Sequence, residues 1–151
     1  MDTLNTYSRL SGAATLARVL APQQLALKWT TWNPSDVMPA SEVLAGWTLG
    51  LSPGQGGVEL ALLYVYGRNF TWYAQNQSLP LVPVSGASVT LKGPPLAGAT
   101  TAIAVCYNTT TGAPLGAGEA AGCGASIVGG DVVVSFPVFV RDAAAVVNFA
   151  A

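Results

Sequence analysis

Short apolar strands separated by turns rich in Gly and Pro make up the sequence from Leu25 onward, and this pattern restricts the fold more than any other feature. Apolar and polar side chains alternate along 25–32 and 132–140, as they do in strands with one buried face. The run 58–66 is apolar almost throughout, which indicates a central strand covered on both faces. The expected strands are 25–32, 43–51, 58–66, 70–74, 88–91, 100–107, 132–140 and 143–149.

Three segments fall outside the strand pattern. Apolar residues recur at helical spacing from Leu10 to Leu20, so 3–20 is expected to be the one helix, ended by Pro22. Two prolines in 79–84 fit an edge strand or an extended connector, and the Gly-rich stretch 108–124 is expected to be a long loop. The sequence therefore predicts a mainly β protein with one domain over 1–151. We expect a single antiparallel β-sandwich (jelly-roll or Ig-like) with one short N-terminal helix, the segment 1–24 packing on it or on a neighbouring subunit.

Charged residues are scarce. They make up 9% of the chain, against roughly 25% in an ordinary soluble domain, and the formal net charge is −1. The six Lys and Arg residues are scattered, so no nucleic-acid partner is expected. The longest apolar run, 60–66, is far shorter than the roughly 20 residues of a membrane-spanning helix. A neutral polar surface instead favours burial against copies of the same chain, so a homo-oligomer or polymer is expected, with glycan as a further candidate partner.

The residue inventory argues against catalysis. The chain has no histidine, which excludes Ser-His-Asp and Cys-His nucleophile systems. The seven acidic residues show no spacing that indicates a carboxylate pair or a calcium loop. We therefore expect a protein that is not an enzyme, with no catalytic residue, no metal site and no cofactor.

Cys106 and Cys123 are the two cysteines, 17 positions apart. Without histidine they cannot complete a zinc site, so we predict a disulfide, the alternative being two unconnected thiols. Asn69, Asn76 and Asn108 each begin an N-x-S/T glycosylation acceptor. These features favour an extracellular or virion-surface location. The acidic start of the chain does not read as a signal peptide, so we expect either a leader removed beforehand or a virion component.

Aromatic residues are the remaining candidates for contacts. Trp32, Trp72 and Tyr73 are predicted to be exposed and to stack on sugar rings or anchor a protein interface, the alternative for each being the core.

Residues 88–149 carry a resemblance to a known family. The strand Val89-Thr90-Leu91 and the run 102–108 are followed by the corner Pro137-Val138-Phe139-Val140-Arg141-Asp142-Ala143-Ala144. This succession resembles the non-catalytic C-terminal β-sandwich module of secreted glycoside hydrolases. The resemblance implies a sandwich fold and no catalytic residue in this chain.

Two functional hypotheses follow. The first is a non-enzymatic structural subunit that self-assembles through β-rich, charge-poor surfaces, as a virion coat or decoration protein or an extracellular filament subunit. We expect the N-terminal segment or the strand 25–32 to mediate contact between copies. The alternative is a carbohydrate-facing accessory module of a secreted glycoside hydrolase.

Overall fold

The computed structural model describes residues 29–31, 37–39, 43–51, 60–69, 76–93, 96 and 98–151, the first three ranges by their backbone alone. The predicted helix 3–20 and the predicted strand 70–74 lie outside these residues, as does the predicted arm 1–24. Nine strands are found within them: β1 (Trp29–Thr31), β2 (Val37–Pro39), β3 (Val43–Leu51), β4 (Leu60–Gly67), β5 (Ser88–Leu91), β6 (Thr101–Tyr107), β7 (Gly124–Val128), β8 (Asp131–Ser135) and β9 (Asp142–Ala150).

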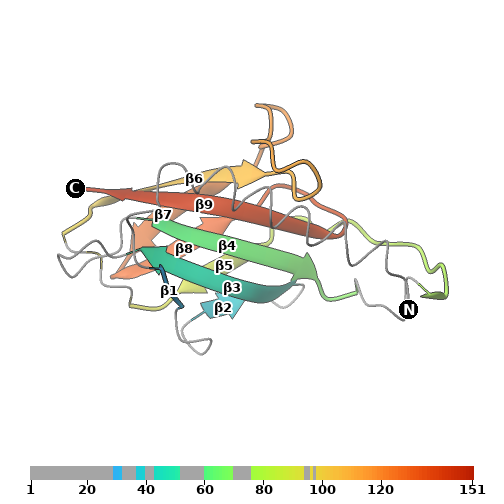
Figure 1. Cartoon of the computed structure of the whole chain (residues 1–151), viewed down its shortest axis with the longest axis horizontal. Helices are drawn as coiled ribbons and strands as arrows, with labels where there is room; N and C mark the ends of the chain where they lie inside the picture. The colour runs from blue at the N-terminus through green and yellow to red at the C-terminus, as the bar shows by residue number, and fades with distance from the viewer. Residues whose placement is uncertain are drawn as a thin grey trace.

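The strands form two antiparallel sheets. The larger has the order β1-β3-β4-β9-β6 and the smaller the order β2-β5-β8-β7, with β4 and β9 well inside the larger sheet. Figure 1 shows the smaller sheet lying behind the larger one. The chain is thus a mainly β protein with the layered architecture of a β-sandwich, as its sequence predicts.

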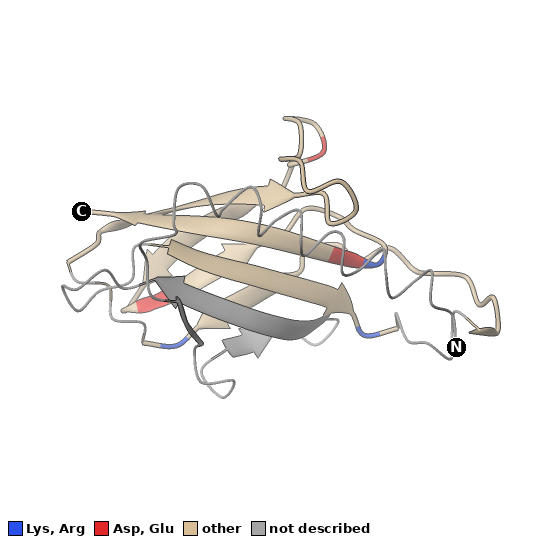
Figure 2. Cartoon of the chain, in the orientation of Figure 1, with Lys and Arg blue, Asp and Glu red and all other residues tan. Residues whose placement is uncertain are grey.

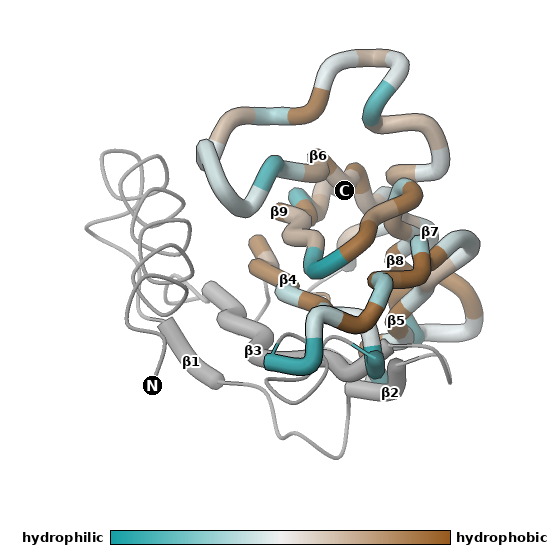
Figure 3. Tube along the Cα trace, turned by 90° about the vertical axis from the view of Figure 1, so that its right-hand side faces the viewer, coloured by the Kyte–Doolittle hydropathy of each residue, from teal (hydrophilic) through white to brown (hydrophobic). Residues whose placement is uncertain are grey.

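Side chains that alternate along the strands fill the space between the sheets. Leu63 and Val65 of β4, with Val147 of β9, meet Val89 of β5 and Val134 of β8, and all five are fully buried. Figure 3 shows the apolar colour following the strands of both sheets. Because successive strand residues point to opposite faces, this core fixes which face of each strand looks inward.

The central strands are apolar on both faces. On β9, Ala143, Ala145 and Val147 belong to the inner core, while Ala144 and Val146 point the other way and are buried too. On β4 the inner-face residues Ala61, Leu63 and Val65 are buried and most of the outer-face residues are half-buried, and the strand lies between β3 and β9 as a central strand should. The sequence therefore identified the centre of the larger sheet correctly.

The segment 79–84 is an extended connector, which is one of its two predicted forms, and a pair of backbone hydrogen bonds joins Val84 to Phe139. Other parts of the structure differ in detail from the prediction. The strand predicted over 132–140 ends at Ser135, because Pro137 has no N–H to continue the ladder. Strands β2 and β7 were not expected from the sequence.

Candidate functional site

The predicted disulfide between Cys106 and Cys123 is present in the structure. Cys106 is the last inward-facing residue of β6, and Cys123 comes directly before β7. The bridge therefore ties the edge strand of one sheet to the edge strand of the other. The loop between the two cysteines projects beyond the sheets (Figure 1).

Strand β6 is one edge of the larger sheet, and part of its outer side is unpaired. The carbonyl of Cys106 accepts a hydrogen bond from Leu115 N–H at 2.9 Å, so the backbone of Cys106 points away from β9. By strand alternation the backbone groups of Ala102 and Ala104 point the same way. Among the described residues no strand pairs with them, and Cys123 Sγ lies 3.9 Å from the carbonyl oxygen of Ala104.

Strand β7 is the corresponding edge of the smaller sheet. It is joined to β8 by the two-residue turn Gly129-Gly130, whose φ values of 61° and 87° are those of a type I′ hairpin. In such a hairpin the residues flanking the turn bond to each other, so the backbone groups of Ala125 and Ile127 point away from β8. Because β6 and β7 lie at the same side of the sandwich, they form one surface, here named the open edge (β6 and β7).

Two of the features that often protect sheet edges are missing from β6 and β7. Neither β6 nor β7 contains a charged residue or a proline. Ile103 and Val128 are instead 63% and 61% exposed there. Figure 2 shows the described charges at strand ends and in loops, away from the middle of either strand. Natural proteins commonly place Lys, Pro or a bulge at exposed edges to prevent pairing with other chains, so this edge is suited to accept a strand.

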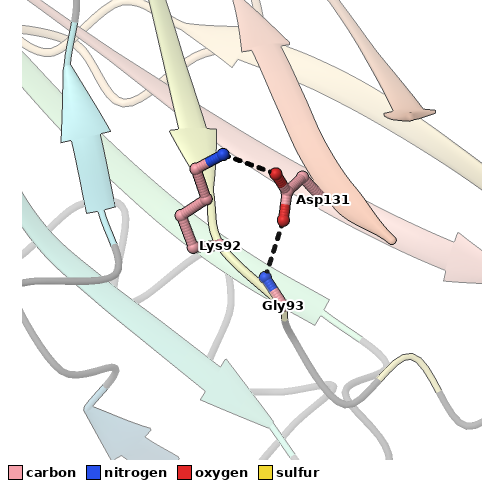
Figure 4. Close-up of polar contacts among 3 residues, drawn as sticks. All are labelled: Lys92, Gly93 and Asp131. Carbon is pink, nitrogen blue, oxygen red and sulfur yellow. Dashed lines mark hydrogen bonds and ion pairs between the residues drawn. The ribbon is translucent and has the colours of Figure 1, made fainter. Parts of the chain in front are cut away.

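One ion pair fastens the β7–β8 hairpin to β5. Lys92 Nζ lies 2.6 Å from Asp131 Oδ2, and Gly93 N–H donates to Asp131 Oδ1 at 3.0 Å (Figure 4). The hydrogen bond from Lys92, followed by that from Gly93, lowers the pKa of the Asp131 carboxyl below its ordinary 3.8. The hairpin that carries β7 is thus held at its turn by a carboxylate in its charged form.

Asp131→Asn is expected to lower the free energy of unfolding slightly at neutral pH. A depressed carboxyl pKa adds stability above the ordinary value of 3.8, and this stability is lost as the pH falls through the lower, folded-state pKa. The difference between wild type and variant should therefore disappear in strongly acidic solution. Urea unfolding at neutral and acidic pH checks this, with Glu119→Gln as the control; an equal difference at both pH values would contradict the expectation.

A second polar cluster joins three strands at the other end of the larger sheet. Asp142 of β9 accepts a hydrogen bond from the hydroxyl of Tyr64 on β4 at 2.7 Å and another from Thr109, two residues after β6. Among the described residues the cluster consists of one carboxylate and two hydroxyl groups, which link β9 to β4 and to the end of β6. The described residues contain no group of three or more Cys, Asp or Glu side chains able to hold a metal ion.

The remaining predicted site residues fall into two sets. Asn69, Asn76 and Asn108 are exposed, and the side-chain oxygen of Asn108 accepts hydrogen bonds from the N–H groups of Thr110 and Thr111 at 2.9 and 3.0 Å. Trp32, Trp72 and Tyr73 lie outside the described residues, so their predicted contacts stay predictions. In the part of the chain that the structure describes, no helix has the length and apolarity needed to cross a membrane.

The sequence reasoning missed the open edge because it missed β7. The signal was present: Gly129-Gly130 follows the apolar residues of β7 and precedes those of β8, which is a recognised hairpin pattern. With β7 placed as a strand, the loop between the cysteines would have connected two neighbouring edges.

Comparisons with known proteins identify no family. No family model matches the chain, and no curated protein matches its sequence. Among solved structures, the chain is similar to α-L-fucosidase isoenzyme 2 from Paenibacillus thiaminolyticus, with 14% sequence identity and a TM-score of 0.39. The match covers 90% of this chain and 17% of the fucosidase, so the chain corresponds to a small part of that protein. At this TM-score the similarity supports no statement about function.

Proposed function

We propose that the chain is a non-enzymatic structural subunit that self-assembles by accepting a strand of another copy at the open edge. The observation that carries the proposal is the pair of neighbouring, uncharged and proline-free edge strands β6 and β7. Outward backbone groups on such strands are a template for main-chain hydrogen bonds with an added strand. The disulfide beside this edge fits an oxidising location such as an extracellular filament or a virion surface.

The two sides of the sandwich favour an assembly that repeats in one direction. In the larger sheet β1 is one edge and β6 the other, and in the smaller sheet β2 is one edge and β7 the other. If β1 of one copy pairs with β6 of the next, the larger sheet continues through successive copies. An interface between two different surfaces of the same protein forms a ring or an open filament. This assigns a role to the strand 25–32, whose described part is β1.

The low charge supports the same conclusion. The six strands from β4 to β9 contain two charged residues, Asp131 and Asp142. Each lies at the end of a strand and accepts a hydrogen bond. Little like-charge repulsion would oppose the approach of a second copy. The absence of histidine from the whole sequence supports the non-enzymatic part of the proposal.

A lysine placed on the open edge is expected to stop assembly. Ile103→Lys on β6 and Val128→Lys on β7 introduce a charge directly beside the position of an added strand. Light scattering after size exclusion should then give the monomer mass of 15.4 kDa for at least one variant, while wild type gives multiples of it. The variant that acts identifies the sheet that is extended.

Val138→Lys is the matched control, because Val138 is 63% exposed, like Ile103, but lies outside β6 and β7. It should assemble as wild type does, with the same polymers in electron microscopy. A wild-type protein that stays monomeric at high concentration would contradict the proposal, as would assembly unaffected by both edge lysines.

A further inference from the structure

The connector between β4 and β5 contains a short extended stretch with a defined beginning and end. Ser78 and Gly86 have positive φ values of 51° and 67°, and none of the residues between them has a positive φ. The extended stretch therefore lies between two residues in the left-handed region. It contains the run Leu79-Pro80-Leu81-Val82-Pro83-Val84, in which the prolines are three positions apart. In Figure 1 it belongs to the yellow-green trace that runs beyond the strands at the right-hand end.

Burial along this stretch repeats at every third residue. Leu81 and Val84 are partly buried, and Val84 packs against the main core. Leu79 and Val82 are 49% and 62% exposed, and both prolines are exposed as well. A strand would alternate with a period of two, whereas a polyproline II helix has three residues per turn. The pattern is typical of a polyproline II helix that has one edge on the protein and two apolar edges in solvent.

The backbone of the stretch agrees with this conformation. A proline ring holds φ at about −65°, close to the polyproline II value of about −75°. Backbone hydrogen bonds join Val84 to Phe139, while 79–83 make none with other described residues. A polyproline II helix likewise has no internal hydrogen bonds and leaves its backbone groups to solvent. The pairing with Phe139 thus fastens one end of the stretch and leaves the rest accessible to a partner.

The positions of the two prolines argue against pairing of this stretch with an added strand. In a β-ladder, every second residue along one side of a strand uses its N–H and C=O groups. Pro80 lies at an even position and Pro83 at an odd one, so each side of the stretch lacks one N–H. A strand added on either side would therefore miss a hydrogen bond, whereas recognition of a polyproline II helix uses its apolar edges.

We propose that the stretch 79–84 is a docking segment for a protein domain with an aromatic-lined groove. Such grooves recognise Pro-x-x-Pro segments in the polyproline II conformation, and Pro80-Leu81-Val82-Pro83 has this spacing. The two prolines would be about 9 Å apart along the helix. Because the conformation is already formed in the folded chain, docking costs little conformational entropy.

The surroundings of the docking segment (79–84) define the partner further. Val138 and Val140 flank Phe139, the residue that pairs with Val84, and are 63% and 44% exposed. Contiguous exposed apolar surface of this kind often marks a site of protein interaction. No charged residue lies between Arg68 and Lys92, so the matching groove is expected to be apolar and uncharged. The docking segment lies outside β6 and β7, so this proposal does not depend on assembly at the open edge.

Biolayer interferometry of the full chain, with a panel of SH3, WW and EVH1 domains as probes, tests the proposal. At least one of these domains is expected to bind saturably. Pro80→Ala/Pro83→Ala should weaken that binding by about tenfold or more, because it removes apolar contacts and the fixed φ. Val82→Glu keeps both prolines, places a charge on an exposed edge and should weaken binding similarly. Pro114→Ala, at an exposed proline outside the docking segment, is the matched control and should bind as wild type does.

A second measurement leaves this chain unchanged. Replacing an aromatic residue of the groove by Ala in the bound domain should abolish binding to the wild-type chain, and urea unfolding of each variant of the chain should give the wild-type midpoint. Absence of binding to every domain of the panel would overturn the proposal. Binding that survives both substitutions in the docking segment, or that ignores the change in the groove, would overturn it too.

Discussion

Leu63→Ala is expected to lower the free energy of unfolding by about 2–5 kcal/mol. Leu63 is fully buried near the middle of β4, between the two sheets, and its side chain belongs to the main core. Truncation removes apolar contact and leaves a cavity that neighbouring strands cannot close without breaking their hydrogen-bond ladders. For a domain of this size the melting temperature should fall by roughly 2–4 °C for each kcal/mol lost. Urea unfolding and calorimetry measure both quantities.

Val138→Ala is the control for the core substitution. Val138 is 63% exposed, so its truncation removes little buried area and should change stability by less than about 0.5 kcal/mol. Similar losses for the two variants would show that Leu63 does not lie in the core of the folded protein.

The alternation of apolar residues was a reliable guide where a strand stays regular. Strands β4 and β9 were predicted almost at their observed positions because each is long, apolar and central. Strands β5 and β6 were also predicted close to their observed positions, because each has a boundary at a Gly- or Pro-rich turn. In these segments the alternation of apolar residues in the sequence matches the burial of the side chains in the folded sheets.

The prediction failed where the backbone changes its period. The sequence places Phe136, Val138 and Val140 on one face, but Phe136 is buried while Val138 and Val140 are 63% and 44% exposed. Pro137 interrupts the β8 ladder, and Phe139, three positions after Phe136, turns into the core beside Val84. Two-residue alternation does not predict the orientation of Phe139, because its orientation depends on Val84, 55 positions earlier in the chain.

The candidate site was harder to foresee than the fold. A sequence shows that a strand lacks charge and proline, but only the sheet order shows that the strand is an edge. The predicted disulfide indicated where the open edge lies, since it links β6 to the start of β7. The ion pair between Lys92 and Asp131 has no sequence signal, because its residues are 39 positions apart and meet through the pairing of β5 with β8.

Reduction of the disulfide is expected to lower the free energy of unfolding by about 3 kcal/mol, because it releases a loop of 17 positions in the unfolded chain. That is a large part of the roughly 5–15 kcal/mol by which domains are stable. Reducing the wild-type protein is the sharper measurement, because both side chains stay in place. Urea unfolding with and without a thiol reductant gives the difference.

The variant Cys106→Ala/Cys123→Ala separates the crosslink from its packing. Cys106 is 2% exposed and lies in the core, so its truncation adds a smaller packing loss to the loss of the crosslink. The double variant should therefore be somewhat less stable than the reduced wild type and insensitive to reductant. Because the bridge also fixes β6 against β7, both forms should exchange the amides of Val105 and Ser126, which face β9 and β8, faster, while those of Leu63 and Val147, in the centre of the larger sheet, change less. Equal unfolding midpoints for oxidised and reduced wild type would contradict a stabilising bridge, and uniform exchange across both sheets would contradict its role at the open edge.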